Sequence, residues 1–339
     1  MRKSIKLLTA LSLALLLPSF SLAQIDNVGT SAANFLKIGI GARAQSMGGS
    51  YVALADEVSA LYWNPAGIAK IKGRQVSFTQ IDWITDVNLS FLGGVFSMGD
   101  AGSMGVSITY LSMGEMKVTN WANPEGTGET FEANDVAIGL AYARRISDMF
   151  TVGIQAKFIQ EKISQCTANA FALDIGVQYN TGFEGLRLGM VLTNFGTEMQ
   201  LSGRDLSIRS DPFNTVGSNP DDVHANLETV GWSLPVSIRL GASMDIIKNN
   251  AIRVTGNLDF YDPRDVDQTW CAGAEVALLG EIVFLRGGVN NYYESELKPS
   301  FGGGIKYSFD DTYGIIIDYA YSDLGRLENA NRFSLSLTF

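Results

Sequence analysis

Few residues of this 339-residue chain have the types and spacing that catalysis requires. The single histidine, His224, lies in the polar segment "NPDDVHANLET", so a two-histidine metal site is excluded. A hydrolase could use one histidine with a serine or an aspartate, but no Gly-x-Ser-x-Gly sequence positions a nucleophile. A solvated loop histidine is the better interpretation, and we expect neither a catalytic residue nor an enzyme.

Two further patterns suggest ligand chemistry without completing a site. Gly39-x-Gly41-x-x-Ala44 is close to a dinucleotide fingerprint, which works only between a strand and a helix of a βαβ unit. No parallel α/β pattern follows it. Three aspartates, Asp262, Asp265 and Asp267, lack the glycine and the terminal glutamate of a calcium loop. We expect no cofactor, no metal, and an acidic external loop around these aspartates.

The first residues predict export from the cytoplasm. Arg2, Lys3 and Lys6 precede the apolar run "LLTALSLALLLPSF", and Ser21-Leu22-Ala23 offers the small residues of a cleavage site. We expect a signal peptide over residues 1–23. A membrane anchor is disfavoured because the apolar stretch is short and ends in small residues.

Charge and cysteine content limit the partners of the exported chain. Loss of the three basic residues of the signal peptide takes the formal charge from −10 to −13, which disfavours nucleic acid as a partner. Cys166 and Cys271 match no zinc or redox spacing, and in an exported protein they could form one disulfide. We interpret both as structural and leave their pairing open.

After Gly73 the chain alternates apolar residues on one parity with small or polar residues on the other, as strands do. In "DVAIGLAYARR", for example, Ile138 and Leu140 face away from Ala137 and Gly139. The predicted strands lie at 74–83, 86–98, 102–112, 133–146, 150–164, 168–180, 185–195, 232–247, 251–261, 267–279, 281–293, 299–309, 312–322 and 331–339. Fourteen is an even number, as bacterial outer-membrane barrels require. The prediction is an all-β, antiparallel transmembrane barrel.

Connection lengths and aromatic residues support this prediction. Connections after even strands are short, whereas those after odd strands include 113–132 and 196–231. Outer-membrane barrels combine short periplasmic turns with longer external loops, so both termini are expected in the periplasm. Predicted aromatic girdles comprise Trp83, Trp232, Phe260, Tyr261, Trp270, Tyr292, Tyr293 and Tyr321 at the outer ends, and Phe150, Tyr179, Phe309, Tyr313 and Phe339 at the inner ends.

The inward parity of the predicted barrel is polar, so the lumen is either wet or filled by a polar plug. Its charged members are Lys157, Asp174, Arg187, Arg239, Arg253, Asp259, Glu275, Lys306 and Asp318. The last strand ends in Phe339 with Leu337 and Leu335 at alternate positions, a pattern similar to the signal that the barrel-assembly machinery recognises. That machinery and outer-membrane lipid are therefore expected partners.

The segment before the barrel, residues 24–73, predicts a plug. Asp56 can cap a short helix through "EVSALYW", and Asn64 can cap the next turn with Pro65 at its first position. Many alanines and glycines let backbone approach backbone closely. Such a segment suits the confined lumen of the barrel at 74–339.

At these residues the sequence resembles a family. "FLKIGIGARAQSMGGSYVALADEVSALYWNPAG", followed by "IAKIKGRQVSFTQIDW", is similar to the N-terminal signature of the PorV/PorQ family, relatives of the FadL fatty-acid transporters. The resemblance implies a FadL-like barrel in the Gram-negative outer membrane, with an N-terminal hatch that carries the motif Asn64, Pro65, Ala66 and Gly67. For PorV-like members it also implies a role in type IX secretion, in which the barrel binds the signal domain of exported cargo and delivers it to other secretion components.

Two functions remain open at this point. In the first, a plugged, non-enzymatic barrel binds cargo through loops 113–132 and 196–231. In the alternative, a FadL-like barrel passes small hydrophobic molecules through a pocket beside the hatch. Its expected lining residues, for which packing as plug against the wall is the better interpretation, are Met47, Tyr51, Leu54, Leu61, Tyr62 and Trp63.

Overall fold

The computed structural model describes residues 28–85, 87–210, 223–291, 297–310, 313–325 and 329–339. The predicted signal peptide lies outside these residues, as do Tyr292 and Tyr293 of the predicted outer girdle. Within the described ranges, no helix has the length and apolar content that crossing a membrane requires.

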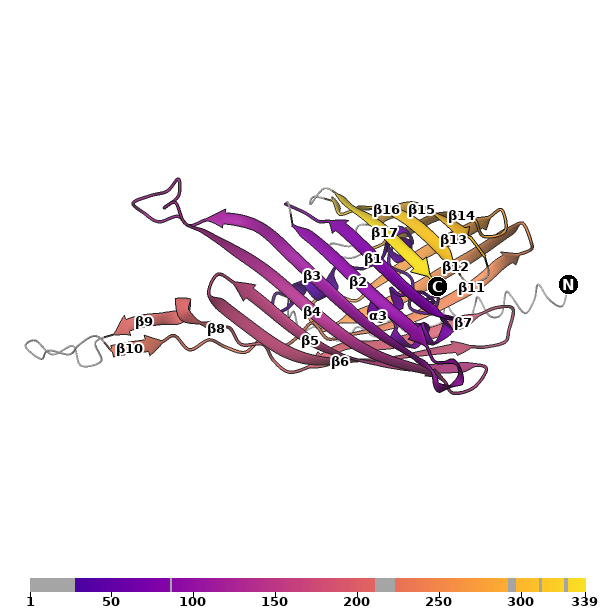
Figure 1. Cartoon of the computed structure of the whole chain (residues 1–339), viewed down its shortest axis with the longest axis horizontal. Helices are drawn as coiled ribbons and strands as arrows, with labels where there is room; N and C mark the ends of the chain where they lie inside the picture. Colours follow the sequence, from indigo (N-terminus) through magenta and orange to yellow (C-terminus); the bar gives the residue numbers. More distant parts are fainter. Residues whose placement is uncertain (1–27, 86, 211–222, 292–296, 311–312, 326–328) are drawn as a thin grey trace, which may run out of the picture.

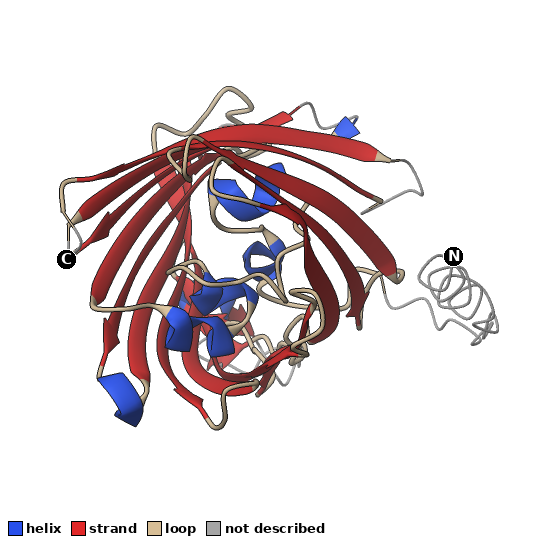
Figure 2. Cartoon of the chain, turned by 90° about the vertical axis from the view of Figure 1, so that its right-hand side faces the viewer, coloured by secondary structure: helices blue, strands red, loops and turns tan. Residues whose placement is uncertain are grey.

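The described residues form a closed barrel of fourteen antiparallel strands, as predicted (Figures 1 and 2). The first seven are β1 (Arg74–Asp82), β2 (Asn88–Ser97), β3 (Ser103–Lys117), β4 (Thr130–Arg145), β5 (Phe150–Ile163), β6 (Cys166–Asn180) and β7 (Arg187–Gly196). The others are β11 (Ser237–Lys248), β12 (Ile252–Pro263), β13 (Thr269–Leu278), β14 (Val283–Asn290), β15 (Lys298–Ser308), β16 (Gly314–Asp323) and β17 (Asn329–Thr338). Pairing of β17 with β1, where Val76 lies opposite Leu337, closes the ring. Closure satisfies the backbone groups that an open sheet would expose to lipid.

The alternation of side chains matches a membrane barrel. Ile138 and Leu140 on β4 point outward and are 49% and 54% exposed, whereas Ala137, Gly139 and Ala141 between them are buried inside. The apolar parity therefore faces the surroundings and the small or polar parity faces the lumen. A soluble protein would reverse this pattern, because water excludes apolar surface.

The two ends of the barrel differ. Short turns join the strands at the end where the C-terminus lies. The two longest connections, 118–129 and 197–236, leave the opposite end, which we call the loop end, although only residues 164–165 join β5 to β6 there (Figure 1). At the loop end β3 and β4 extend beyond their predicted bounds, so that only residues 118–129 connect them.

The connection at 196–231 contains elements that the sequence did not predict. They are β8 (Ser202–Gly203), the 3-10 helix η4 (Arg204–Leu206), β9 (Ser207–Ser210) and β10 (Val223–Asn226). The short strand β8 pairs with β6, and β9 pairs with β10 to form a separate hairpin. We call residues 202–210 and 223–226 the extension; they project beyond the rim of the barrel (Figure 1).

The N-terminal segment lies inside the ring of strands (Figure 2). Its elements are η1 (Asn34–Lys37), α2 (Ala42–Ser46), α3 (Ala60–Trp63) and η2 (Pro65–Lys70). Residues 34–71, here called the plug, supply about half of the buried apolar core. The prediction that Asp56 caps the following helix is wrong. The N-cap of α3 is Ser59, and the Asp56 carboxylate instead accepts hydrogen bonds from Arg43 and Tyr51.

Two residues of the predicted outer girdle point inward instead. Tyr261 is buried, and the Arg239 guanidinium lies 4.0 Å from its ring centroid. Trp83 packs against the plug core, below Arg332. Tyr261 occupies the inward parity of β12, and Trp83 continues the inward parity of β1 one residue beyond its end, so side-chain direction overrides position at a strand end. The outward members Trp232, Phe260 and Trp270 are exposed, as a girdle requires.

The final strand presents its apolar residues to the outside of the barrel. Leu335, Leu337 and Phe339 are all exposed, and the backbone of Phe339 pairs with Arg74 next to the closing seam. Recognition of these residues by the assembly machinery stays a prediction. Their outward orientation leaves the side chains accessible before the barrel closes.

The outward face of β4 provides a test of membrane residence. We expect Leu140→Arg to destabilise the folded barrel in lipid by about 2–4 kcal/mol, because it puts a cation near the middle of the bilayer. The measurement is urea unfolding in liposomes, followed by heat-modifiable gel migration. Trp121→Arg, in the exposed 118–129 loop, is the matched control and should unfold like the wild type. Equal stability of the two variants would contradict a lipid-facing β4.

Candidate functional site

The motif Asn64, Pro65, Ala66 and Gly67 lies against the inner wall of the barrel. Asn64 is fully buried and is the N-cap of η2; its Oδ1 accepts the Ala66 N–H at 3.2 Å, with Pro65 at the first helical position. Its Nδ2 donates to the carbonyls of Val52 in the plug and Val177 on β6, both at 3.0 Å. One amide therefore caps a turn and joins the plug to the wall, which a carboxylate could not do because it has no donor.

Two glycines of the wall make room for this motif. A Cβ added to Gly176 on β6 would lie 2.0 Å from Asn64 Oδ1, and one added to Gly153 on β5 would lie 2.3 Å from the Ala66 nitrogen. Both distances are shorter than any real contact, so only glycine lets the turn approach the strands this closely. The small residues on the inward faces of these strands thus leave space for the plug to pack against the wall.

A second part of the plug, around Tyr51 and Val52, is held through its backbone. Asp259 Oδ2 on β12 accepts the N–H groups of Tyr51 and Val52 at 2.8 and 2.9 Å. Gln178 on β6 donates to the Val52 and Ala55 carbonyls at 3.1 and 2.9 Å. Two strands three steps apart in the ring, β12 and β6, therefore bind backbone groups of one plug loop.

An ion-pair network centred on Glu275 joins the plug to the wall at a third place. Glu275 on β13 is fully buried and contacts Arg43 of the plug at 2.8 Å, Arg253 of β12 at 3.0 Å and Arg286 of β14 at 2.7 Å. Arg43 also contacts Asp56 at 2.7 Å, within the plug. Charges buried in this way are tolerated only when they are paired and hydrogen-bonded, so each member depends on the others.

A cavity of about 320 Å³ lies on the side of the plug that faces the short turns. It is lined by charged groups of the network and by Glu57. Burial raises the pKa of the Glu57 carboxyl above its ordinary value, while nearby Arg43 acts in the opposite direction. This inner cavity is small and strongly polar.

A larger cavity of about 1010 Å³ opens toward the loop end, and we call it the vestibule. Plug residues Asn34, Phe35, Ile38, Gly39 and Gln45 form part of its lining. Its wall carries the cations Arg239, Lys298 and Arg332, the carboxylates Asp135, Glu161, Asp267 and Asp323, and apolar residues such as Trp83, Leu111 and Met113. The vestibule and the inner cavity share no lining residue, because the plug lies between them.

The six residues expected beside a hatch pocket have different places. Met47, Tyr51, Leu54 and Trp63 are fully buried and belong to the plug core. In the described cavities, only Leu61 and Tyr62 of the six are lining residues, in a small cavity of about 40 Å³. Most of the six residues therefore pack in the core of the plug. The vestibule is lined by different plug residues.

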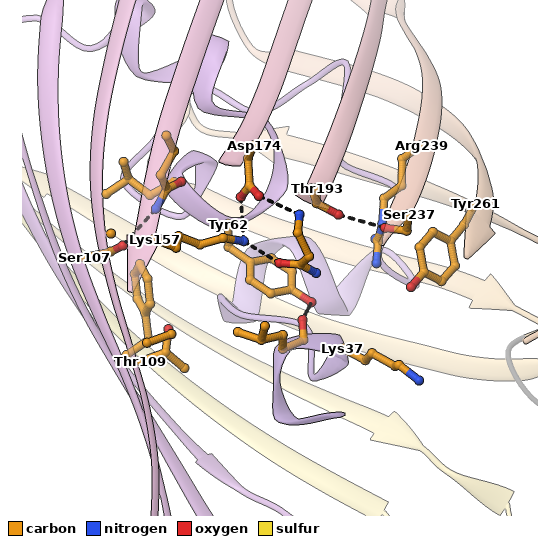
Figure 3. Close-up of a pocket in the computed structure, with 17 residues that line it drawn as sticks. Lys37, Tyr62, Ser107, Thr109, Lys157, Asp174, Thr193, Ser237, Arg239 and Tyr261 are labelled. Carbon is orange, nitrogen blue, oxygen red and sulfur yellow. Dashed lines mark hydrogen bonds and ion pairs between the residues drawn. The ribbon is translucent and has the colours of Figure 1, made fainter. Parts of the chain in front are cut away.

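The small cavity is polar and lies between the plug and strands β2 to β7, β11 and β12 (Figure 3). Lys157 contacts Asp174 at 2.7 Å, and Asp174 also accepts the Asn194 N–H at 2.7 Å. Thr193 and Ser237 share a hydrogen bond of 2.8 Å between β7 and β11. A space of this size holds only a few water molecules, so it is too small for an organic ligand.

The residues that first suggested chemistry do not form a reactive site. His224 is exposed on β10 opposite Arg209. Gly39 lies against the Gln45 side chain, and Gly41 precedes a helix of five residues rather than a βαβ helix. Within the described ranges, no group of three His, Cys, Asp or Glu side chains is placed to bind a metal.

The three aspartates separate from one another. Asp265 is buried, where it accepts hydrogen bonds from Ser31 and Lys37 near the start of the plug, whereas Asp267 is exposed. Within the expected acidic loop, Asp265 therefore binds the N-terminal segment instead of facing solvent. Cys166 on β6 and Cys271 on β13 are both buried and are not joined by a disulfide.

Sequence reasoning placed Asp259 and Glu275 in the lumen but did not identify their roles, and it did not single out Arg43, Gln178 or Arg332. The available signal was parity: Gln178 and Arg332 lie on the polar faces of their strands. The parity of a strand residue predicts only whether its side chain points inward or outward. Its contacts with the plug depend on the path of the plug backbone, which has no regular repeat.

A closed barrel with lipid-facing apolar residues and an internal plug defines this chain as a plugged outer-membrane barrel. A model of the family described as "Type IX secretion system protein PorV" matches residues 21–201, more than half of the chain. The chain belongs to this family, and it is an outer-membrane protein associated with type IX secretion. A search of curated proteins finds no match.

Solved structures share the fold at low sequence identity. The CymD monoaromatic hydrocarbon channel is 12% identical, with a TM-score of 0.54 over 89% of this chain and 98% of that chain. The toluene transporter TbuX of Ralstonia pickettii is 13% identical, with a TM-score of 0.54 over 88% and 97%. The toluene transporter TodX of Pseudomonas putida is 12% identical, with a TM-score of 0.53 over 88% and 96%. These likenesses establish a FadL-like fold.

The Glu275 network provides a test of how the plug is held. We expect Glu275→Gln to destabilise the barrel by about 3–5 kcal/mol, because it leaves buried arginines without their shared carboxylate. Hydrogen exchange of residues 34–71 should increase at the same time. Glu281→Gln is the matched control, since Glu281 is exposed and contacts only Arg253 among the charged groups of the network. Unchanged exchange in Glu275→Gln would contradict an anchoring role.

Proposed function

We propose that this protein binds exported cargo at its loop end and presents it to other type IX secretion components, while the plug keeps the lumen closed. The single observation that carries this proposal is the extension. In the described part of the chain, β9 and β10 pair only with each other, which leaves both outer edges of the hairpin without a strand partner. Exposed strand edges are the usual means of adding a strand from another chain.

The surroundings of the hairpin support the same role. Ile208 on β9 and Leu227 and Val230 beyond β10 are exposed large apolar residues outside the barrel wall. Apolar side chains beside a free strand edge can supply pockets for a β-rich signal domain, while backbone hydrogen bonds supply affinity. Family membership agrees with cargo of the type IX pathway.

The proposal includes an orientation and two further partners. We place the short turns and both termini in the periplasm and the loop end at the cell surface, following the usual arrangement of such barrels. Phe339, Leu337 and Leu335 then form the signal for the assembly machinery, and the outward apolar faces contact outer-membrane lipid. Surface-facing loops are the part of the protein that cargo meets after export.

Replacement of residues 204–229 by a short Gly-Ser linker tests cargo binding. This change removes the hairpin but keeps β8 and the bridge between Met199 and Trp232. We expect cargo release to the cell surface to fall about tenfold or more, and cargo to be lost from the purified barrel. The matched control replaces residues 119–126 in the β3–β4 connection and should retain release. Wild-type release and co-purification in the 204–229 variant would contradict the proposal.

The alternative function is FadL-like passage of small hydrophobic compounds. The vestibule favours it, because a partly apolar cavity of about 1010 Å³ reaches the plug, and the solved structures of similar fold include toluene transporters. Passage would require the plug to break its contacts with Val177, Asp259 and Glu275 of the wall.

Toluene uptake into liposomes separates the two functions. We expect the wild-type barrel to admit toluene no faster than protein-free liposomes, because the plug separates the two cavities. A Glu275→Gln barrel that stays folded is the comparison in which the plug is loosened. Rapid uptake by the wild type, above that of liposomes with a heat-denatured sample, would favour the transport function instead.

A further inference from the structure

Arg332 is a buried cation whose side chain reaches the vestibule. Its residue is 1% exposed, and it lines the cavity next to Trp83 and Gly39. Nε donates to the Gly39 carbonyl at 3.2 Å, and Nη1 donates to Ser322 Oγ at 3.0 Å. Its other contact is with the Trp83 ring, whose centroid lies 5.6 Å from Cζ.

The electrostatic environment of Arg332 differs from that of the arginines in the Glu275 network. Arg43 and Arg286 each contact the Glu275 carboxylate, and Arg286 also contacts Asp318. For Arg332, no carboxylate among the described residues lies within 4.0 Å. A buried guanidinium is costly without an anion, and its planar fork suits a carboxylate with two parallel hydrogen bonds.

Arg332 lies apart from one pair of carboxylates in the vestibule. Asp135 and Glu161 are register partners on β4 and β5, and four strand steps separate β4 from β17, which carries Arg332. Arg239 on β11, stacked between the rings of Trp63 and Tyr261 at 4.8 and 4.0 Å, is three strand steps from β5. A carboxylate bound at Arg332 is therefore attracted by the guanidinium and lies away from Asp135 and Glu161, whereas Asp323 on the neighbouring strand β16 opposes it.

We propose that the vestibule binds the C-terminal carboxylate of an extended polypeptide, with Arg332 as the residue that recognises it. This inference rests on the proposed cargo-binding function and names the chemical group that the vestibule recognises. The occupant enters from the loop end, where the vestibule opens, and its terminal carboxylate meets the Nη2 group of Arg332 beside the plug.

The lining favours a polypeptide over a fatty-acid-like amphiphile. Besides apolar residues, the vestibule is lined by the amide side chains of Gln45 and Gln268, while the amides of Asn34 and Asn291 in the lining already bond Ser31 and the Trp270 N–H. A side-chain amide both donates and accepts hydrogen bonds, so it matches peptide backbone groups, which a hydrocarbon chain lacks. A volume of about 1010 Å³ is also at the upper end of ligand pockets, which suits several residues of peptide.

The test measures peptide binding to the purified full-length barrel in detergent. The probe is a fluorescein-labelled octapeptide of alternating serine and valine, made with a free C-terminal carboxylate or as the C-terminal amide, and read by fluorescence anisotropy. We expect the free acid to bind about tenfold more tightly than the amide, as hydrogen bonds to a charged group imply. Arg332→Gln should remove this preference, Arg332→Lys should retain part of it, and Arg74→Gln, on the exposed start of β1, should leave it intact.

The acid-to-amide ratio separates recognition from a structural role of Arg332, because loosening the plug alone would affect both peptides equally. Heat-modifiable migration confirms that each variant is folded. Equal binding of the two peptides, no binding of the free acid, or an unchanged ratio in Arg332→Gln would overturn the inference. Displacement by octanoate at lower concentration than by unlabelled peptide acid would assign the site to an amphiphile and overturn it too. Cargo release in the 204–229 variant is measured separately. Failure of the proposed cargo-binding function is therefore distinguishable from failure of carboxylate recognition by Arg332.

Discussion

The account of a plugged barrel depends on the ion pairs that the Glu275 carboxylate makes with three arginines. This carboxylate is buried in the wall and contacts Arg43 of the plug together with Arg253 and Arg286 of the neighbouring strands. Glu275 requires these arginines because an unpaired charge in this interior is costly, and it is the carboxylate that all three share, beside the separate contacts of Arg43 with Asp56, Arg253 with Glu281 and Arg286 with Asp318. The plug is consequently part of the folded barrel rather than a separate unit resting in its lumen.

The rest of the interior follows from this arrangement. Wall glycines such as Gly153 and Gly176 let the Asn64 turn reach the strand backbone, and Asp259 and Gln178 bind plug backbone groups that would otherwise be unsatisfied. With the lumen filled in this way, the free space lies at the two ends. The larger space opens toward the loop end, from which the extension also projects, so the features suited to a partner are at one end of the molecule.

Strand alternation in the sequence predicts the fold well, because lipid outside and polar groups inside impose a period of two on every strand. It predicts all fourteen strands and the direction of residues such as Leu140, Asp259 and Glu275. Asn64 is also identified as a cap from its neighbour Pro65. The path of the plug is not predictable in this way, since it has no period. Thus Asp56 pairs with Arg43 instead of capping a helix, and the expected pocket residues Met47 and Trp63 are core.

The central claim is that wall contacts hold the plug in place and close the lumen. Current recording on the wild-type barrel in a planar lipid bilayer tests it most directly, because ions report any continuous water path between the vestibule and the inner cavity. The account predicts no steady open-pore current after insertion. A stable, ohmic conductance in the unmodified protein would contradict it.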